Sequence, residues 1–232
     1  MKLTKTIEEE YASIEETVIQ LKKLPQYSDE IITYFKTWET ETAIELQEIF
    51  RSISRYHQEE ILPRVYSYFE NVSEELSYKA EDITHFCFAL EQKQHVKWFE
   101  FTGVFISTLI SKLQKIESIE KLEEQNKIDN KKITNNEKDT EYFLVTNHLK
   151  KKMDALGCNN SGRIKIIGDC GNNAGFFMQK GTLHIEGNVD NYLGAYMQGG
   201  EIFVTGKSGS DVGKYMKMGN IYVAGNCKRK IL

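Results

Sequence analysis

The chain has 232 residues, of which 40% are hydrophobic and 28% are charged, so it is long enough for two domains with ordinary hydrophobic cores. Its most apolar run, residues 101–110, is only about half the ~20 residues that a membrane-spanning helix needs, so no membrane span is expected. Fifteen of the sixteen glycines lie from Gly157 onward, and this asymmetry predicts a molecule of two parts.

Residues 1–122 are predicted to form an all-α domain of long amphipathic helices. Apolar side chains recur there at intervals of three and four residues, which places them on one helix face. Pro25 ends the first predicted helix, Pro63 breaks or kinks the second, and a fourth starts after Asp82. The lengths favour an antiparallel bundle or an elongated coiled-coil hairpin, and the pattern does not separate the two. The apolar stripes are Leu3, Ile7, Tyr11, Ile14, Val18 and Leu21; Ile31, Phe35, Trp38, Ile49, Phe50 and Ile53; Val65, Phe69, Val72 and Leu76; and Phe86 to Ile116.

Two short segments follow the predicted helical domain. Residues 123–139 contain almost no core-forming side chains and are predicted to be a polar linker. Residues 140–156 are apolar again, begin with Thr140 and stop at Gly157, a pattern typical of a capped helix with a glycine stop.

Residues 157–232 repeat with a period of 19. Leu183 and Ile185 alternate with His184, as in a short strand that buries one face. Nineteen residues are too few for a strand, a full helix and two loops, so the repeat predicts a parallel β-helix with 19-residue coils. The positions that keep the period are Gly168, Gly187, Gly206 and Gly225; Gly175, Gly194 and Gly213; Gly181, Gly200 and Gly219; and Met178, Met197 and Met216.

Equivalent positions in successive coils of a β-helix stack in columns, and the side chains here suit such stacking. We expect one aromatic column, one methionine column and one polar ladder at a corner. These columns are interpreted as packing rather than as a cofactor site. The aromatic column is predicted from Cys158, Phe177, Tyr196 and Tyr215, and the polar ladder from Asn172, Asn191 and Ser210.

The stretches Gly168-Asp-Cys-Gly-Asn-Asn-Ala-Gly and Gly187-Asn-Val-Asp-Asn-Tyr-Leu-Gly, each continuing to a Met and a Gly, resemble the GXGXG β-helix domain. That domain closes the large subunit of glutamate synthase and forms much of one subunit of formylmethanofuran dehydrogenase. The resemblance covers about residues 157–227 and implies a right-handed parallel β-helix with an architectural role. The redox chemistry of those enzymes does not transfer, because the sequence shows no flavin barrel and no clustered cysteines for an iron–sulfur centre.

The ends and the charges of the β-helix suggest how it is covered. An uncovered β-helix end exposes unpaired strand edges, so we expect the 140–156 helix to lie over the first coil. The opposite end has only residues 226–232, which act as a basic shield or leave a docking face for a second copy or another subunit. Residues 157–232 carry a net charge of about +4 and residues 1–156 about −8. The favoured interpretation is two solvated surfaces, and attraction between the two parts, or between two copies, is the alternative.

Apparent catalytic and ligand motifs are weak. The stretch Gly206-Lys207-Ser208 lacks the earlier glycine of a phosphate loop, because Glu201 occupies that position.

A metal site is not indicated near Asp82. The nearby residues His85, Cys87 and His95 lack the paired Glu-x-x-His motifs of di-iron bundles. The carboxylates of Glu59 and Glu60 near His57 fit a solvated helix face rather than an acid–base pair. Cys170 and Cys227 are predicted to share a column about 14 Å apart, too far for a disulfide.

No catalytic, cofactor-binding or metal residue is therefore predicted, and an enzyme is not expected. The favoured function is a non-catalytic scaffold or assembly protein, whose helical part and β-helix bind protein partners or a second copy. The alternative is an accessory structural subunit of a multisubunit oxidoreductase, glutamate synthase-like or formylmethanofuran dehydrogenase-like. Nucleic acid is not an expected partner, because the repeat lacks a dense Lys/Arg stripe. The charged start shows no signal peptide, so a cytoplasmic location is expected.

Overall fold

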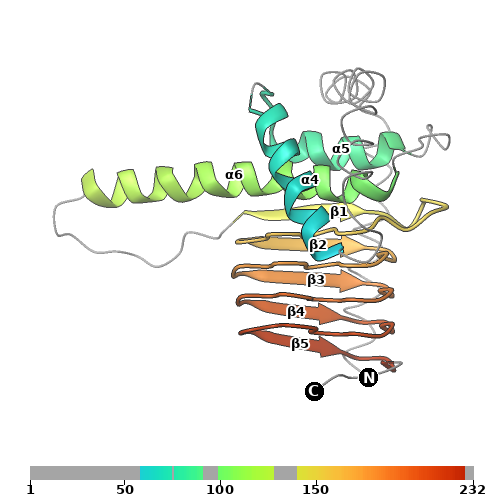
Figure 1. Cartoon of the computed structure of the whole chain (residues 1–232). Coiled ribbons are helices and arrows are strands. Elements are labelled where there is room, and N and C mark those ends of the chain that lie inside the picture. Colours follow the sequence, from blue (N-terminus) through green and yellow to red (C-terminus); the bar gives the residue numbers. More distant parts are fainter. Residues whose placement is uncertain (1–57, 75, 91–98, 128–139, 228–232) are drawn as a thin grey trace, which may run out of the picture.

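The computed structural model describes residues 58–74, 76–90, 99–127 and 140–227. In this part of the chain, three helices precede five strands (Figure 1). The helices are α4 (Gln58–Val72), α5 (Ala80–Ala89) and α6 (Phe99–Lys127), and the strands are β1 (Glu141–Val145), β2 (Arg163–Ile167), β3 (Thr182–Glu186), β4 (Glu201–Val204) and β5 (Asn220–Val223).

The five strands form one parallel sheet in the order β1-β2-β3-β4-β5. From β2 onward each residue pairs with the residue 19 positions later, so that Leu183 lies between Ile164 and Ile202. Residues at alternate positions point inward and are buried, as the period of two predicts. The predicted parallel β-solenoid with a spacing of about 19 residues is thus confirmed.

A second side of each coil is held by single parallel bridges rather than by full strands. They link Met153, Cys170, Val189, Ser208 and Cys227 in one column. A third line of backbone hydrogen bonds closes the remaining corner, where the amide of Phe177 donates to Ala195 and that of Tyr196 donates to Lys214. Every coil is therefore bonded to the next along several sides, which makes the solenoid a rigid body.

The segment 140–156 is not the predicted capping helix. Residues Glu141–Val145 form β1, which pairs in parallel with β2 and makes residues 140–160 the first coil. Its pattern of buried and exposed positions is the same as that of β2, because Tyr142 and Leu144 alternate with outward-facing residues. The apolar residues of this segment fit both periods, and pairing with the free edge of β2 decides in favour of the strand.

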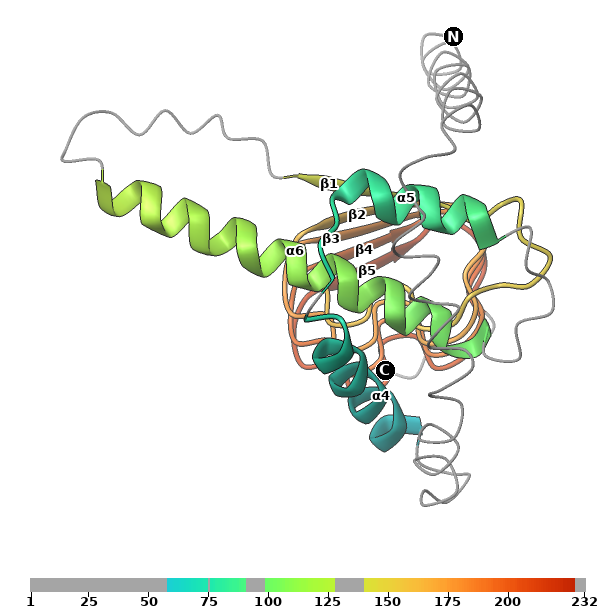
Figure 2. The same ribbon diagram turned by 90° about the horizontal axis from the view of Figure 1, so that it is seen from above.

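The first coil is covered by helices instead. Figure 1 shows α6 lying across the top of the solenoid and projecting beyond it, and Figure 2 shows α5 running along β1 with α4 on the opposite side of α6. Gly103 of α6 touches the backbone of Asp154, where any Cβ would overlap the Asp154 carbonyl oxygen. Ser107 Oγ, one turn later, donates a hydrogen bond of 3.1 Å to the carbonyl of Ala155. This close approach lets a helix satisfy backbone acceptors of the exposed coil.

A buried amide group continues this helix-to-coil contact. Gln114 Nε2 of α6 donates to Asn160 Oδ1 at 2.8 Å, and Gln114 Oε1 accepts from the backbone N–H of Ser161 at 3.1 Å. Both Gln114 and Asn160 are almost fully buried. Since buried amides are costly when unpaired, this network fixes the position of α6 over the coil.

One hydrophobic core runs from the helices into the solenoid, from Leu62 in α4 to Val204 in β4. The described helices and the coils of the solenoid therefore share one core. Helix α4 ends at Val72, before Leu76, and holds Pro63 within it. The fourth helix predicted from the sequence is instead two helices, α5 and α6. Helix α6 also extends to Lys127, into the segment predicted to be a linker. A long-helix bundle or coiled-coil hairpin is not confirmed, and residues 1–57, 91–98 and 128–139 lie outside the described residues.

Candidate functional site

The repeated glycines lie where the coils turn and approach one another. A Cβ at Gly187, Gly206 or Gly225 would meet the carbonyl of the equivalent glycine one coil earlier, and one at Gly168 would meet Asn147 and Thr146. A second set has positive φ angles, which side chains other than glycine rarely adopt. These positive-φ glycines are Gly175, Gly194 and Gly213, with φ of 62° to 68°, and Gly181, Gly200 and Gly219, with φ of 79° to 106°.

The methionine column lies inside the solenoid and the aromatic column lies outside it. Met178 and Met197 are fully buried, whereas Met216 in the last coil is partly exposed. The rings of Phe177 and Tyr196 stack with centroids 5.9 Å apart. The first member of the aromatic column is Asn159, not the predicted Cys158, because the amide of Asn159 donates to Phe176 as that of Phe177 donates to Ala195. Ring stacking between neighbouring coils, as between Phe177 and Tyr196, stabilises the solenoid.

Two polar ladders run along the corners of the solenoid. Asn172 Oδ1 accepts from the backbone N–H of Asn191, and Asn191 Oδ1 accepts from that of Ser210, at 3.1 and 2.9 Å. Asp154 begins this ladder by accepting from the backbone N–H of Asn172 at 2.7 Å. The side chains expected to form a ladder thus do so, and each bond serves the backbone of the next coil.

The residues of the apparent phosphate loop form another corner of this kind. The backbone N–H of Lys207 donates to Asn188 Oδ1 at 2.9 Å, and the Lys207 side chain is exposed. Ser208 is buried and its hydroxyl lies 3.0 Å from Cys227 Sγ. With the serine turned inward and the amides occupied by coil-to-coil bonds, this stretch is not arranged as a phosphate cradle.

The histidines and cysteines of the described residues do not gather into a metal site. No group of three or more His, Cys, Asp or Glu that could hold a metal ion occurs in the described part of the chain. His85 and Cys87 are buried in α5, and His95 lies outside the described residues. All four cysteines are free, and burial raises the pKa of the Cys87 and Cys158 thiols to about 12. These thiols are neutral packing groups rather than nucleophiles.

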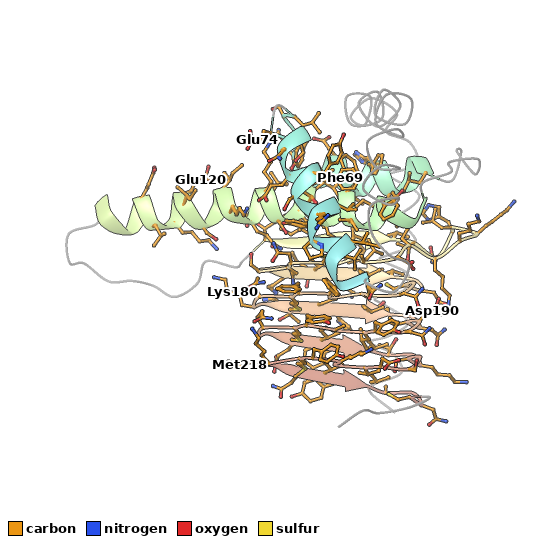
Figure 3. The ribbon with its side chains drawn as sticks, in the orientation of Figure 1. Phe69, Glu74, Glu120, Lys180, Asp190 and Met218 are labelled. Carbon is orange, nitrogen blue, oxygen red and sulfur yellow. The ribbon has the colours of Figure 1, made fainter. Side chains whose placement is uncertain are left out.

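Exposed large hydrophobic side chains of the described residues gather at two places. One is the α6 arm, defined here by Ile116, Ile119 and Leu122 on the projecting half of the helix, where Figure 3 labels Glu120. The other is the last coil, residues 209–227, with Tyr215, Met218 and Tyr222; Met218 lies at the end of the solenoid far from the helices (Figure 3). Their exposed fractions range from 43% to 68%. Grouped apolar exposure of this kind marks interaction surfaces.

The last coil differs from the inner coils in burial, not in sequence pattern. Ile221 and Val223 of β5 are partly exposed, whereas Ile202 and Val204 at the equivalent positions of β4 are buried. Tyr222 stacks on Phe203 with centroids 4.9 Å apart but has no ring on its other side among the described residues. The last coil thus offers the surface that each inner coil presents to its successor.

Sequence reasoning points to one of these two surfaces, the docking face at the end of the repeat near residue 227. The α6 arm is not predicted, because Ile116 is assigned from the sequence to the apolar stripe that faces the core. A signal for the arm is present in the sequence. Ile116, Ile119 and Leu122 lie among seven charged residues from Lys112 to Glu124, beyond the densely apolar part of the helix.

The coils and their side-chain columns define the class of protein as a parallel β-solenoid, closed at one end by helices. Within the described residues, no helix combines the length and the apolar character that crossing a membrane requires. The family model for the GXGXG motif matches residues 109–231, more than half of the chain, and the chain belongs to this family. The match begins inside α6, so it includes the first coil and part of its cover. No curated protein and no solved structure matches the chain.

Proposed function

We propose that this protein is a non-catalytic scaffold that holds other polypeptide segments against a rigid solenoid. The observation that carries the proposal is the grouping of exposed apolar side chains on the α6 arm and on the last coil. These are the surfaces through which the scaffold binds. The repeated glycines, methionines and asparagines stabilise the coils. Partner binding is therefore assigned to other side chains, on the outer surface.

The structure suits this function because the two surfaces are held at a constant separation. A continuous core joins α6 to the coils, and the buried Gln114–Asn160 bond holds the helix in place. A partner on the α6 arm would therefore be positioned relative to a segment on the last coil. Fixing two bound segments in one geometry raises their effective concentration toward each other.

A charged substitution on the α6 arm tests the proposal. Ile119→Glu places a carboxylate in the apolar surface, whereas Ser118→Glu adds the same charge at a neighbouring exposed position of α6. The full chain is tagged and purified at native abundance, and co-purifying proteins are quantified. We expect a partner that is retained by wild type and Ser118→Glu and lost with Ile119→Glu.

The outcome that contradicts the proposal is an identical set of co-purifying proteins for wild type and both variants. Partners that carry flavin, molybdopterin or iron–sulfur clusters would instead favour the accessory-subunit alternative. Circular dichroism of both variants checks that the helix remains folded, so that a lost partner reports on the surface.

A further inference from the structure

The last coil exposes the kind of surface that the rest of the molecule covers. Within the described residues β5 is paired on one edge alone, and Ile221 and Val223 are only partly covered. At the opposite end the first coil is covered by α6 of the same chain. The exposed end of the last coil is therefore a surface that a further polypeptide segment could cover.

Charge and topology argue against a second copy of the same end. Residues 206–232 carry six basic residues and one acid, Asp211, so two such ends repel each other. Lys207 and Lys217 have exposed side chains in this region. A head-to-tail stack of copies would need the first coil, which α5 and α6 already cover (Figure 2). An acidic segment with apolar side chains fits both the charge and the apolar surface.

Residues 37–50 of this chain have that composition. The stretch Thr-Trp-Glu-Thr-Glu-Thr-Ala-Ile-Glu-Leu-Gln-Glu-Ile-Phe contains four acids and no base. It also contains Trp38, Ile44, Leu46, Ile49 and Phe50. Residues 1–57 as a whole have seven basic and eleven acidic residues, a net charge of −4, opposite in sign to the last coil.

The place where the described chain begins brings these residues within reach. In Figure 1, α4 begins at the level of the coils and ends above β1, and Figure 2 shows it on the outer side of α6. The chain before Gln58 therefore leaves α4 at the level of the coils rather than above them. Three coil spacings, from β2 to β5, amount to about 14 Å. Residues 37–50 lie 8 to 21 positions before Gln58, and eight residues of chain reach at most about 26 to 29 Å, so this distance is within their reach.

We infer that residues 37–50 of the same chain bind across the last coil and cover its apolar end, with their carboxylates facing Lys207 and Lys217. This inference rests on the proposed function in treating the last coil as a binding surface. It assigns that surface to the chain's own segment and leaves the α6 arm for a foreign partner.

Site-specific crosslinking in the full chain tests the assignment. A photoreactive phenylalanine analogue replaces Met218, and the same analogue at Lys180, an exposed site on an earlier coil, is the matched control. After irradiation, crosslinked peptides are identified by mass spectrometry. We expect crosslinks from position 218 to residues 37–50 in material of monomer mass, at several-fold higher yield than from position 180.

Charge-reversal variants provide a second test. Lys207→Glu with Lys217→Glu lowers the 218 crosslink several-fold, and adding Glu45→Lys with Glu48→Lys restores it. Lys151→Glu with Lys180→Glu, two exposed lysines on earlier coils, leaves it unchanged. Crosslinks from position 218 to a second copy at dimer mass, or no crosslink to residues 37–50, would overturn the inference. Either result leaves the partner loss expected of Ile119→Glu intact, so the two proposals fail separately.

Discussion

The two ends of the solenoid are built from the same strand pattern and differ in what covers them. Tyr142 in β1 and Ile221 in β5 occupy equivalent positions in the two outermost strands, yet Tyr142 is 2% exposed and Ile221 is partly exposed. At the first end, α5 and α6 supply the covering surface; at the last end, no described residue does. Burial in this fold is therefore a property of the neighbouring coil and not of the strand itself.

A large effect is expected where the cover touches the first coil. Gly103→Ala places a Cβ against the Asp154 carbonyl oxygen and should lower the free energy of unfolding by about 3 kcal/mol. Gly213→Ala in the last coil meets only ordinary contacts and should cost about 1–2 kcal/mol, from its positive φ of 66°. Urea unfolding of both variants measures the difference. Equal losses would show that α6 is not held tightly on the coil.

Paired substitutions in one core column test the contrast between inner and last coils. Ile202→Ala removes a fully buried side chain of β4 and should destabilise the protein by about 2–5 kcal/mol. Ile221→Ala makes the same change in β5, where the side chain is partly exposed, and should cost about 1 kcal/mol. Thermal and urea unfolding measure both. A loss at Ile221 as large as that at Ile202 would indicate that the last coil is covered in solution, as residues 37–50 would cover it.

A smaller effect is expected at the end of α4, where a lysine fixes the helical cover. Lys112 Nζ donates to the carbonyls of Ser73, Glu74 and Leu76 at 2.7, 2.9 and 3.1 Å. Lys112→Met removes three charge-assisted hydrogen bonds and leaves the Ser73 carbonyl with only its bond from the Leu76 amide, so it should cost about 1.5–3 kcal/mol. Lys115→Met is the control, because it removes only a surface ion pair with Glu70, worth about 0–1 kcal/mol. Indistinguishable stabilities would mean that water replaces Lys112 at these carbonyls.

A further effect is expected in the dependence of stability on pH. Burial raises the pKa of the Cys87 and Cys158 thiols to about 12, so between about pH 9 and 12 the folded chain holds protons that the unfolded chain has lost. The free energy of unfolding therefore falls as pH rises, by about 1.4 kcal/mol per pH unit for each thiol. Urea unfolding between pH 9 and 10 should show a shallower slope for Cys87→Ala with Cys158→Ala. An unchanged slope would place these thiols in contact with solvent.

Much of the solenoid follows from the sequence because its repeat is strictly local. A period of 19 places Leu183 opposite Ile202 and Asn172 opposite Asn191, and backbone pairing between coils needs only that equal spacing. The first coil could not be predicted from the repeat because its spacing to the second coil is irregular. Glu141 pairs with Arg163, 22 positions later, whereas Met153 pairs with Cys170, 17 positions later. Without a constant period, residues 140–156 match a helical pattern as well as a strand.

The amino-acid sequence by itself determined the coils, their inward and outward faces and the glycines at their corners, because each depends on short-range spacing. Only the tertiary structure decided which segment covers the first coil, where α6 leaves the body, and which apolar side chains stay exposed. Those features depend on surfaces that meet from distant parts of the chain. The contact between Gly103 and Asp154 joins residues 51 positions apart, and no local pattern specifies it.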